Sequence, residues 1–246
     1  KLLLLLYRLK AIAMSDVESF LAGEGLGSRA FYRFARIIIN FLCRVFWRVR
    51  VTGRENIPLT GAFVLAPVHR SNIDTMLACT VTRRRMRYMG KDSLWKNSIT
   101  GWLFSALGGF PVTRGTADRE ALRRCVYVLQ SGQPLVMFPE GERKSGAVVE
   151  KLFDGAVYVA MKANVPIIPV GIGGSEAAMP KGAKMVRPAR CAMVIGKPII
   201  VDSGDGSRAA RSSVKAMSEE LQLSLQDLLD VAQKSVEPRR VKRSTK

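Results

Sequence analysis

Apolar and cationic residues alternate at helical spacing from Phe31 to Val51, which predicts one long amphipathic helix. Polar positions recur every three or four residues and gather on one face: Arg29, Arg33, Arg36, Asn40, Arg44 and Arg48. The rest of the circumference is apolar: Phe34, Ile37, Ile38, Phe41, Leu42, Val45 and Phe46. The longest charge-free run, Ile37 to Cys43, has seven residues. Crossing a bilayer takes roughly 20 apolar residues, so this helix is too short in apolar sequence to span one.

Two placements of this helix fit its pattern. A purely cationic polar face opposite an aromatic and aliphatic face is typical of a helix that lies in the plane of a membrane surface. The alternative is an ordinary core helix whose arginines face water. The aromatic content of the apolar face favours the membrane placement.

After Val51 the pattern changes to short apolar runs that alternate with helical periodicity. Strands are expected at 62–68, 86–89, 110–112, 135–138, 167–172 and 191–195, and helices at 74–81, 94–107, 117–130 and 155–162. Such alternation predicts an α/β fold, an αβα sandwich around a mixed, largely parallel sheet. We therefore divide the chain into N-terminal amphipathic helices (1–50), one α/β domain (51–235) and a basic tail (236–246). Lys1 to Ala13 are interpreted as an addition ahead of a native start at Met14.

The amino-acid composition indicates an anionic binding partner but does not say which class of anion it is. There are 39 Lys and Arg against 20 Asp and Glu, a net charge of +19, which attracts nucleic acid, anionic lipid or phosphorylated substrates. The four cysteines are scattered in apolar stretches and are expected to be buried free thiols in a reducing compartment: Cys43, Cys79, Cys125 and Cys191. His69 is the only histidine, which excludes a multi-histidine metal site.

His69 follows the predicted strand 62–68 directly, at the end of a strand where open α/β sheets bind ligands. Asp74 comes five residues later, at a predicted helix start. A carboxylate there can orient the imidazole and stabilise its protonated form, while the other ring nitrogen accepts a proton. No Gly-x-Ser-x-Gly nucleophile motif accompanies the pair, so His69 acting directly as general base is the simplest chemistry. Taken alone, this spacing favours the simpler interpretation, a packed histidine and a helix-capping aspartate.

Three further segments stand at predicted strand ends or beside them. Gly108 to Gly115 brings Arg114 into a loop, and the arginine fork suits phosphate. Phe138 to Gly146 (FPEGERKSG) is a charged, glycine-containing loop after another strand. Val165 to Val170 is apolar and bracketed by prolines, and is interpreted as core or as the wall of an acyl pocket, with Val165, Pro166 and Ile168 as its weakly indicated members.

In this order, from about Gly53 to Pro198, the four segments resemble the glycerolphosphate and lysophosphatidic-acid acyltransferase family, the bacterial 1-acyl-glycerol-3-phosphate acyltransferases in particular. The resemblance implies that 51–235 is a catalytic domain, with His69 as general base and Asp74 as its orienting acid. It implies that Arg114 binds the acceptor phosphate and that Glu140, Gly141 and Arg143 belong to the substrate site. Glu142 and Lys144 replace the family's usual Thr and Ser, which puts the acceptor in question, because an added carboxylate disfavours phosphate unless Lys144 or Arg143 offsets it.

The resemblance implies transfer of a fatty acyl group from acyl-CoA or acyl-carrier protein to a hydroxyl of lysophosphatidic acid or glycerol 3-phosphate, with no metal or redox cofactor and no acyl-enzyme. It also implies peripheral attachment to anionic lipid on the cytoplasmic face of the cell membrane. Two alternatives stay open: a glycolipid acceptor, and a basic nucleic-acid-binding protein. Against the latter, the sequence carries no zinc-finger, helix-turn-helix or RNP-like signature.

Overall fold

The computed structural model describes residues 25–112, 119–201 and 211–237, and within them seven strands form one sheet in the order β1-β7-β6-β2-β5-β3-β4. The strands are β1 (Arg50–Thr52), β2 (Val64–Pro67), β3 (Arg87–Lys91), β4 (Gly109–Val112), β5 (Leu135–Val136), β6 (Ile167–Gly173) and β7 (Ala192–Ile195). The helices are α2 (Leu26–Phe46), α3 (Asp74–Ala78), α4 (Ser98–Ala106), α5 (Arg119–Gln130), α6 (Gly155–Ala163), α7 (Ser175–Ala178) and α8 (Arg211–Val236). Two 3₁₀ turns are η1 (Arg54–Asn56) and η2 (Asp92–Trp95).

The sheet is mixed and largely parallel, as the sequence predicted. β2 pairs in parallel with β5 and β6, and β3 with β4 and β5, whereas β7 runs antiparallel to β6 and β1 runs parallel to β7. The carboxyl ends of β2, β5 and β6 therefore lie at the same edge as the amino ends of β1 and β7. We call this the catalytic edge, because His69, the candidate base, follows β2 there.

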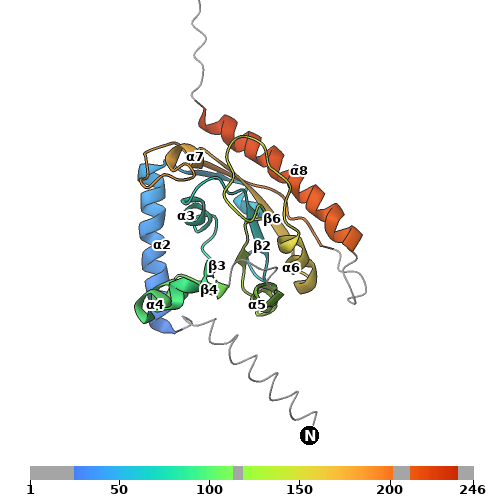
Figure 1. The fold of residues 1–246 in the computed structure, drawn as a ribbon. Helices are drawn as coiled ribbons and strands as arrows, with labels where there is room; N and C mark the ends of the chain where they lie inside the picture. Colours follow the sequence, from blue (N-terminus) through green and yellow to red (C-terminus); the bar gives the residue numbers. More distant parts are fainter. Residues whose placement is uncertain (1–24, 113–118, 202–210, 238–246) are drawn as a thin grey trace, which may run out of the picture.

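The central strands are apolar throughout because both of their faces are covered. Every residue of β2 and β6 is buried. Figure 1 shows α8 on one side of the sheet and α2 on the other, with α3 between α2 and the strands. The approach of α8 is so close that a Cβ on Gly171 would stand 2.2 Å from the Leu228 backbone, and one on Gly173 2.4 Å from the Ala232 backbone. These two glycines allow the helix to lie directly on β6.

The structure corrects the predicted long helix at both ends. α2 begins at Leu26 and ends at Phe46, and Arg50 and Val51 belong to β1. The reason is Trp47, which is buried and donates its indole N–H to the carbonyl of Arg187 (3.1 Å). That contact holds the chain against the segment before β7, and the strand pairing of β1 follows from it. The 26-residue helix α8 was not predicted, although its buried residues have helical spacing: Val214, Ser218, Leu221, Leu225, Leu229 and Ala232.

α2 turns its apolar side chains away from the sheet. Its buried residues are Ser28, Tyr32 and Cys43, whereas Ile37 and Phe41 are each 64% exposed. Also exposed are Leu26, Phe34, Ile38, Val45 and Phe46. The interpretation of α2 as a core helix with solvent-facing arginines is therefore wrong. No helix in the described ranges has the length and apolar character needed to cross a membrane.

Candidate active site

His69 and Asp74 meet at the catalytic edge, as the sequence predicted. The imidazole Nδ1 lies 3.0 Å from Asp74 Oδ2, where β2 passes into α3. Oδ2 also accepts the backbone N–H groups of Arg70 (2.7 Å) and Ser71 (2.6 Å). Asp74 is fully buried, and 17% of the His69 side chain is exposed. An ionised carboxylate only accepts hydrogen bonds, so Nδ1 carries the proton and the lone pair belongs to Nε2. Nε2 has no hydrogen-bond partner in the described part of the chain and is the atom able to act as base.

Phe138 fixes the plane of the imidazole. Its ring stacks on that of His69, with centroids 4.0 Å apart and planes inclined by 23°. Phe138 comes just after β5, the strand that pairs directly with β2. The imidazole of His69 is therefore held from two directions: Asp74 contacts its edge, and Phe138 stacks on its face.

A buried ion pair lies behind the base. Arg70 Nη1 donates to both oxygens of Glu140, at 2.6 and 2.7 Å, and the two side chains are 1% and 0% exposed. Glu140 Oε2 also accepts the backbone N–H of His69 (2.8 Å). The guanidinium donates from Nε to the carbonyl of Gly146 (3.1 Å) and from Nη2 to that of Val148 (3.1 Å). Arg70 thus fastens the 141–148 loop to the segment that carries His69.

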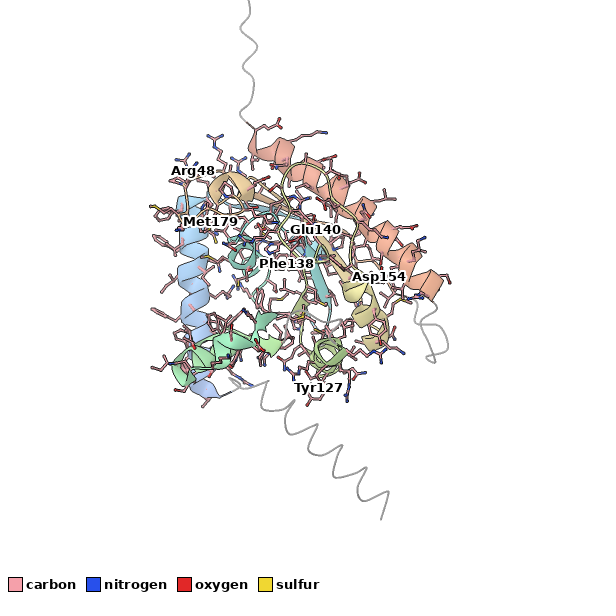
Figure 2. All side chains as sticks on the ribbon, viewed as in Figure 1. Arg48, Tyr127, Phe138, Glu140, Asp154 and Met179 are labelled. Atoms are coloured by element: carbon pink, nitrogen blue, oxygen red, sulfur yellow. The ribbon has the colours of Figure 1, made fainter. Side chains whose placement is uncertain are left out.

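This arrangement gives Glu140 a different position from the one expected of a substrate-contacting residue. The sequence placed it in the substrate site, but its carboxylate is buried and occupied by Arg70 and by the His69 backbone. In this structure it holds the backbone of His69 from behind, and its membership of the substrate site stays a prediction. Figure 2 shows Glu140 and Phe138 together over the middle of the sheet. Arg70 carried no signal in the sequence, because an arginine after a strand is usually solvated.

The loop after Glu140 carries the two departures from the family pattern. Glu142 is paired with Lys144 (3.1 Å) and with Lys181 (3.6 Å), and Lys144 also pairs with Glu150 (2.8 Å). Lys144, and after it Lys181, lowers the pKa of the Glu142 carboxyl. The added carboxylate is therefore offset by Lys144, as one reading of the sequence required, and by Lys181, which the sequence did not indicate.

The other expected substrate residues differ in how the structure places them. Arg143 is half-buried in the same loop, and its Nη1 is buried with no hydrogen-bond partner among the described residues. Gly141 has φ +69°, and a Cβ there would stand 2.7 Å from the Phe153 ring, so glycine is needed for the turn. Arg114 lies outside the described residues. Val165 and Ile168 are buried in the hydrophobic core, Pro166 lies between them, and their role as an acyl pocket stays a prediction.

An apolar cavity of about 270 Å³ lies between α2, α3 and α4. Residues of α3 just beyond Asp74 form one wall, and six of the lining residues are Tyr32, Met76, Cys79, Tyr88, Phe104 and Leu107. The Cys79 thiol and the Tyr88 hydroxyl are 3.0 Å apart. Burial raises the pKa of both groups, so neither is ionised at neutral pH. Thr75 and Met76, which follow Asp74 in the chain, line the cavity, whereas His69 and Asp74 do not. Its volume lies just below the roughly 300 Å³ at which small-ligand sites begin.

All four cysteines are free thiols, as predicted: Cys43, Cys125 and Cys191 are buried and Cys79 is partly exposed. Burial raises the pKa of Cys43, Cys125 and Cys191 to about 12. Within the three described ranges, no cluster of three or more His, Cys, Asp or Glu side chains could hold a metal ion.

Comparison with known proteins supports the motif assignment. A family model described as Acyltransferase matches residues 48–173. A 1-acyl-sn-glycerol-3-phosphate acyltransferase of Bacillus subtilis is 25% identical over 169 residues, which cover 68% of this chain and 82% of that protein. The chloroplastic enzyme LPAT1 of Arabidopsis thaliana is 26% identical over 70% of this chain, and the match spans about half (49%) of its length.

A solved structure has a similar fold. The crystal structure of the 1-acyl-sn-glycerophosphate (LPA) acyltransferase PlsC from Thermotoga maritima superposes with a TM-score of 0.65 at 24% identity. The superposition covers 82% of this chain and 79% of that one. At this identity the likeness concerns the α/β fold alone.

Proposed function

The chain belongs to the acyltransferase family, and from that premise we propose that it transfers a fatty acyl group to the free hydroxyl of a 1-acyl-glycerol-3-phosphate in phospholipid synthesis. One observation carries the proposal: His69 is oriented by a buried Asp74 and keeps Nε2 free at the catalytic edge. The names of the relatives, 1-acyl-sn-glycerol-3-phosphate acyltransferases, support the acceptor class.

In the proposed mechanism, Nε2 of His69 removes the proton of the acceptor hydroxyl as its oxygen attacks the thioester carbonyl. A C–O bond forms, and a tetrahedral oxyanion results. When the oxyanion collapses, the C–S bond breaks and His69 returns the proton to the leaving thiolate of coenzyme A or of the carrier protein. Asp74 stabilises the imidazolium between these steps, and such general-base work is worth roughly 10²–10⁴-fold in rate.

The acceptor phosphate is assigned to Arg143, together with Arg114 on sequence grounds. A buried guanidinium nitrogen without a partner, Arg143 Nη1, supports the assignment, because buried polar groups ordinarily have partners. Lys144 and Lys181 add positive charge around Glu142, so the loop as a whole does not repel a phosphate. A phosphate held away from the reacting hydroxyl supplies orientation without taking part in the chemistry.

The acyl chain of the donor is assigned to the apolar cavity beside α3. Its wall includes Met76 and Cys79, which follow Asp74 by two and five residues, and this short separation along the chain from the candidate base supports the assignment. Replacing Cys79 with Phe should shorten the cavity and shift the preference toward shorter acyl-CoAs, without loss of the shorter-chain rate. An unchanged chain-length profile for a folded C79F protein would place the chain elsewhere, with the Val165–Ile168 region as the remaining candidate.

Attachment to the membrane surface is proposed through α2. Its exposed apolar residues adjoin exposed Ile99 and Trp102 of α4, since the rings of Phe31 and Trp102 lie 5.3 Å apart. Arg29, Arg33 and Arg44 are exposed on the same helix and would meet anionic headgroups. We assign the attachment to the cytoplasmic face of the cell membrane, where thioester donors are available and free thiols stay reduced.

The test is product identification. Purified protein is incubated with acyl-CoAs of several lengths and a panel of acceptors: lysophosphatidic acid, glycerol 3-phosphate and a mannosylated lipid. Mass spectrometry should find phosphatidic acid as the main product, and none with His69→Ala. Acylation of the glycolipid in preference to both phosphorylated acceptors would overturn the acceptor assignment and leave the family membership unchanged.

A further inference from the structure

Three arginines gather at one cavity on the β1 side of the catalytic edge. Arg48, Arg50 and Arg190 line a space of about 220 Å³, which Ser235 and Val236 at the end of α8 close from the other side. The three come from the turn after α2, from the first residue of β1 and from the segment before β7. We call this space the arginine cavity.

Strand direction explains why the arginine cavity shares an edge with the active site. Arg50 pairs with Ala192, and Ala192 pairs with Gly173 at the carboxyl end of β6. Because β1 and β7 run opposite to β2 and β6, their amino ends lie where His69 leaves β2. Figure 2 shows Arg48 at the upper end of α2, on the side of the molecule where Met179 and Glu140 are labelled. The arginine cavity and His69 therefore lie at the same end of the sheet.

The positive charge of the arginine cavity is not balanced by the protein. Within the described ranges, the side chains of Arg48, Arg50 and Arg190 form neither an ion pair nor a hydrogen bond, unlike Arg70 or Arg124. All three arginines are exposed, so water screens part of their mutual repulsion, and an anion between them would lower it further. The planar guanidinium fork matches the oxygens of a phosphate, so phosphate is the anion this geometry favours.

Arg48 occupies a backbone position that disfavours its side chain. Its φ is +43°, in the left-handed region that glycine adopts freely and other residues rarely adopt. Backbone hydrogen bonds on both sides hold it there: the N–H of Val49 donates to the carbonyl of Cys43 (3.2 Å), and that of Cys191 to the carbonyl of Trp47 (2.8 Å). This left-handed residue follows the C-cap Trp47 and ends α2, and it fixes where the Arg48 side chain leaves the backbone.

The surface next to the arginine cavity is apolar. A wider, open pocket of about 460 Å³ shares Arg48 and Arg190 with it and is otherwise lined by Val45, Phe46, Pro188 and Ala189. Beyond it, Met185 is 78% exposed. Cations beside an apolar groove match a molecule with a phosphate and a hydrocarbon part.

We propose that the arginine cavity binds the headgroup phosphate of an anionic membrane phospholipid, whose hydrocarbon part lies along Val45 and Phe46. The proposal rests on the membrane attachment proposed above and adds to it a defined headgroup site that shares no residue with the catalytic one. Its consequence is orientation: a lipid held there, together with the apolar face of α2, keeps the catalytic edge turned toward the bilayer that supplies the acceptor.

The test compares two pairs of substitutions with the same change in net charge. One pair, Arg48→Gly with Arg190→Gln, removes two of the three cations of the arginine cavity. The matched control, Arg211→Gln with Lys215→Gln, alters exposed cations at the other end of α8, about 36 Å from Ser235 at 1.5 Å per residue. Binding is measured by co-sedimentation with vesicles of phosphatidylcholine alone and of phosphatidylcholine with phosphatidylglycerol.

The cavity pair should weaken binding to phosphatidylglycerol vesicles by roughly 25-fold, because each basic residue at an anionic surface is worth about fivefold. It should leave binding to phosphatidylcholine vesicles unchanged, and the control pair should bind like the wild type. Equal losses for the two pairs would mean that only net charge counts, and no loss for the cavity pair would mean that the site is unused. Either result overturns the proposal.

Two further measurements separate this proposal from neighbouring explanations. The melting temperature of Arg48→Gly should equal or exceed that of the wild type, because glycine fits the left-handed backbone, and a clear fall would make Arg48 a structural residue. Inorganic phosphate is then added to the vesicle assay: if micromolar phosphate abolished binding, the cavity would hold free phosphate and not a lipid. The vesicle-binding and melting measurements do not use turnover, so they stay interpretable even if the proposed acyl transfer fails. In a separate activity assay, the cavity pair should keep wild-type turnover on a short-chain, water-soluble acceptor.

Discussion

Removing one partner of the buried Arg70–Glu140 pair should cost more stability than removing both. In Arg70→Met, the Glu140 carboxylate stays in the interior with no cation, which costs about 3–5 kcal/mol for a buried pair. The carbonyls of Gly146 and Val148 also lose their donors, each worth about 1 kcal/mol. Against a typical total of about 5–15 kcal/mol, this variant should be only marginally folded.

Glu140→Gln added to Arg70→Met should restore part of that loss. The glutamine has the shape of the glutamate, carries no charge, and keeps an oxygen for the His69 N–H. Urea unfolding of the wild type, both single variants and the double variant gives the coupling free energy, which we expect at about 1–3 kcal/mol. If the losses in unfolding free energy of the two single variants sum to that of the double variant within about 0.5 kcal/mol, the two charges are not coupled. That result would refute the conclusion that this ion pair holds the 141–148 loop against the segment that carries His69.

Three further predictions concern the base, the thiols and the membrane face. Asp74→Asn should keep the fold but lose most of the turnover, because the amide no longer stabilises the imidazolium; near-normal turnover in a steady-state assay would contradict the role of Asp74. Burial raises the thiol pKa values of Cys43 and Cys125 to about 12, so both should stay protonated at pH 8 and react with a disulfide reagent only after urea is added. Rapid labelling of Cys43 or Cys125 in the native protein would count against this burial. Ile38→Asp with Phe41→Asp should release the protein from anionic vesicles even at low salt, whereas high salt should weaken the binding of the wild type only in part. A variant that pellets like the wild type would show that α2 does not lie in the membrane interface.

The pairing of His69 with Asp74 could be predicted from sequence because its information is local. His69 and Asp74 are five residues apart and follow an apolar strand, so the strand end and the helix start position them without reference to distant residues. Most strands and helices were likewise found within a few residues, since their hydrophobic periodicity is strong. The fold class followed from the alternation of those elements.

The features that could not be predicted depend on contacts between distant segments. Arg70 is buried because Glu140 and the 146–148 carbonyls surround it, and nothing near residue 70 announces them. The end of α2 at Phe46 depends on Trp47 packing under Arg187, 140 residues away. The need for glycine at 171 and 173 comes from α8, whose backbone lies directly against both residues.

The arginine cavity has the same origin. From sequence, Arg48 was placed on the cationic face of the predicted helix, and Arg50 and Arg190 were given no role. The pairing of β1 with β7 brings them to one space, and that pairing joins residues about 140 positions apart. Local sequence patterns carry no information on this pairing of β1 with β7, so they do not predict the arginine cavity.

The central claim is that His69 is the base for acyl transfer, and single-turnover kinetics with acyl-CoA and lysophosphatidic acid test it most directly. The wild type and a folded His69→Ala variant are mixed with both substrates, and the diacyl product is followed by mass spectrometry. The account predicts a loss of roughly 10²–10⁴-fold in the rate of the chemical step, with a circular dichroism spectrum like that of the wild type. A His69→Ala protein of native fold that acylates lysophosphatidic acid within a few fold of the wild-type rate would contradict it.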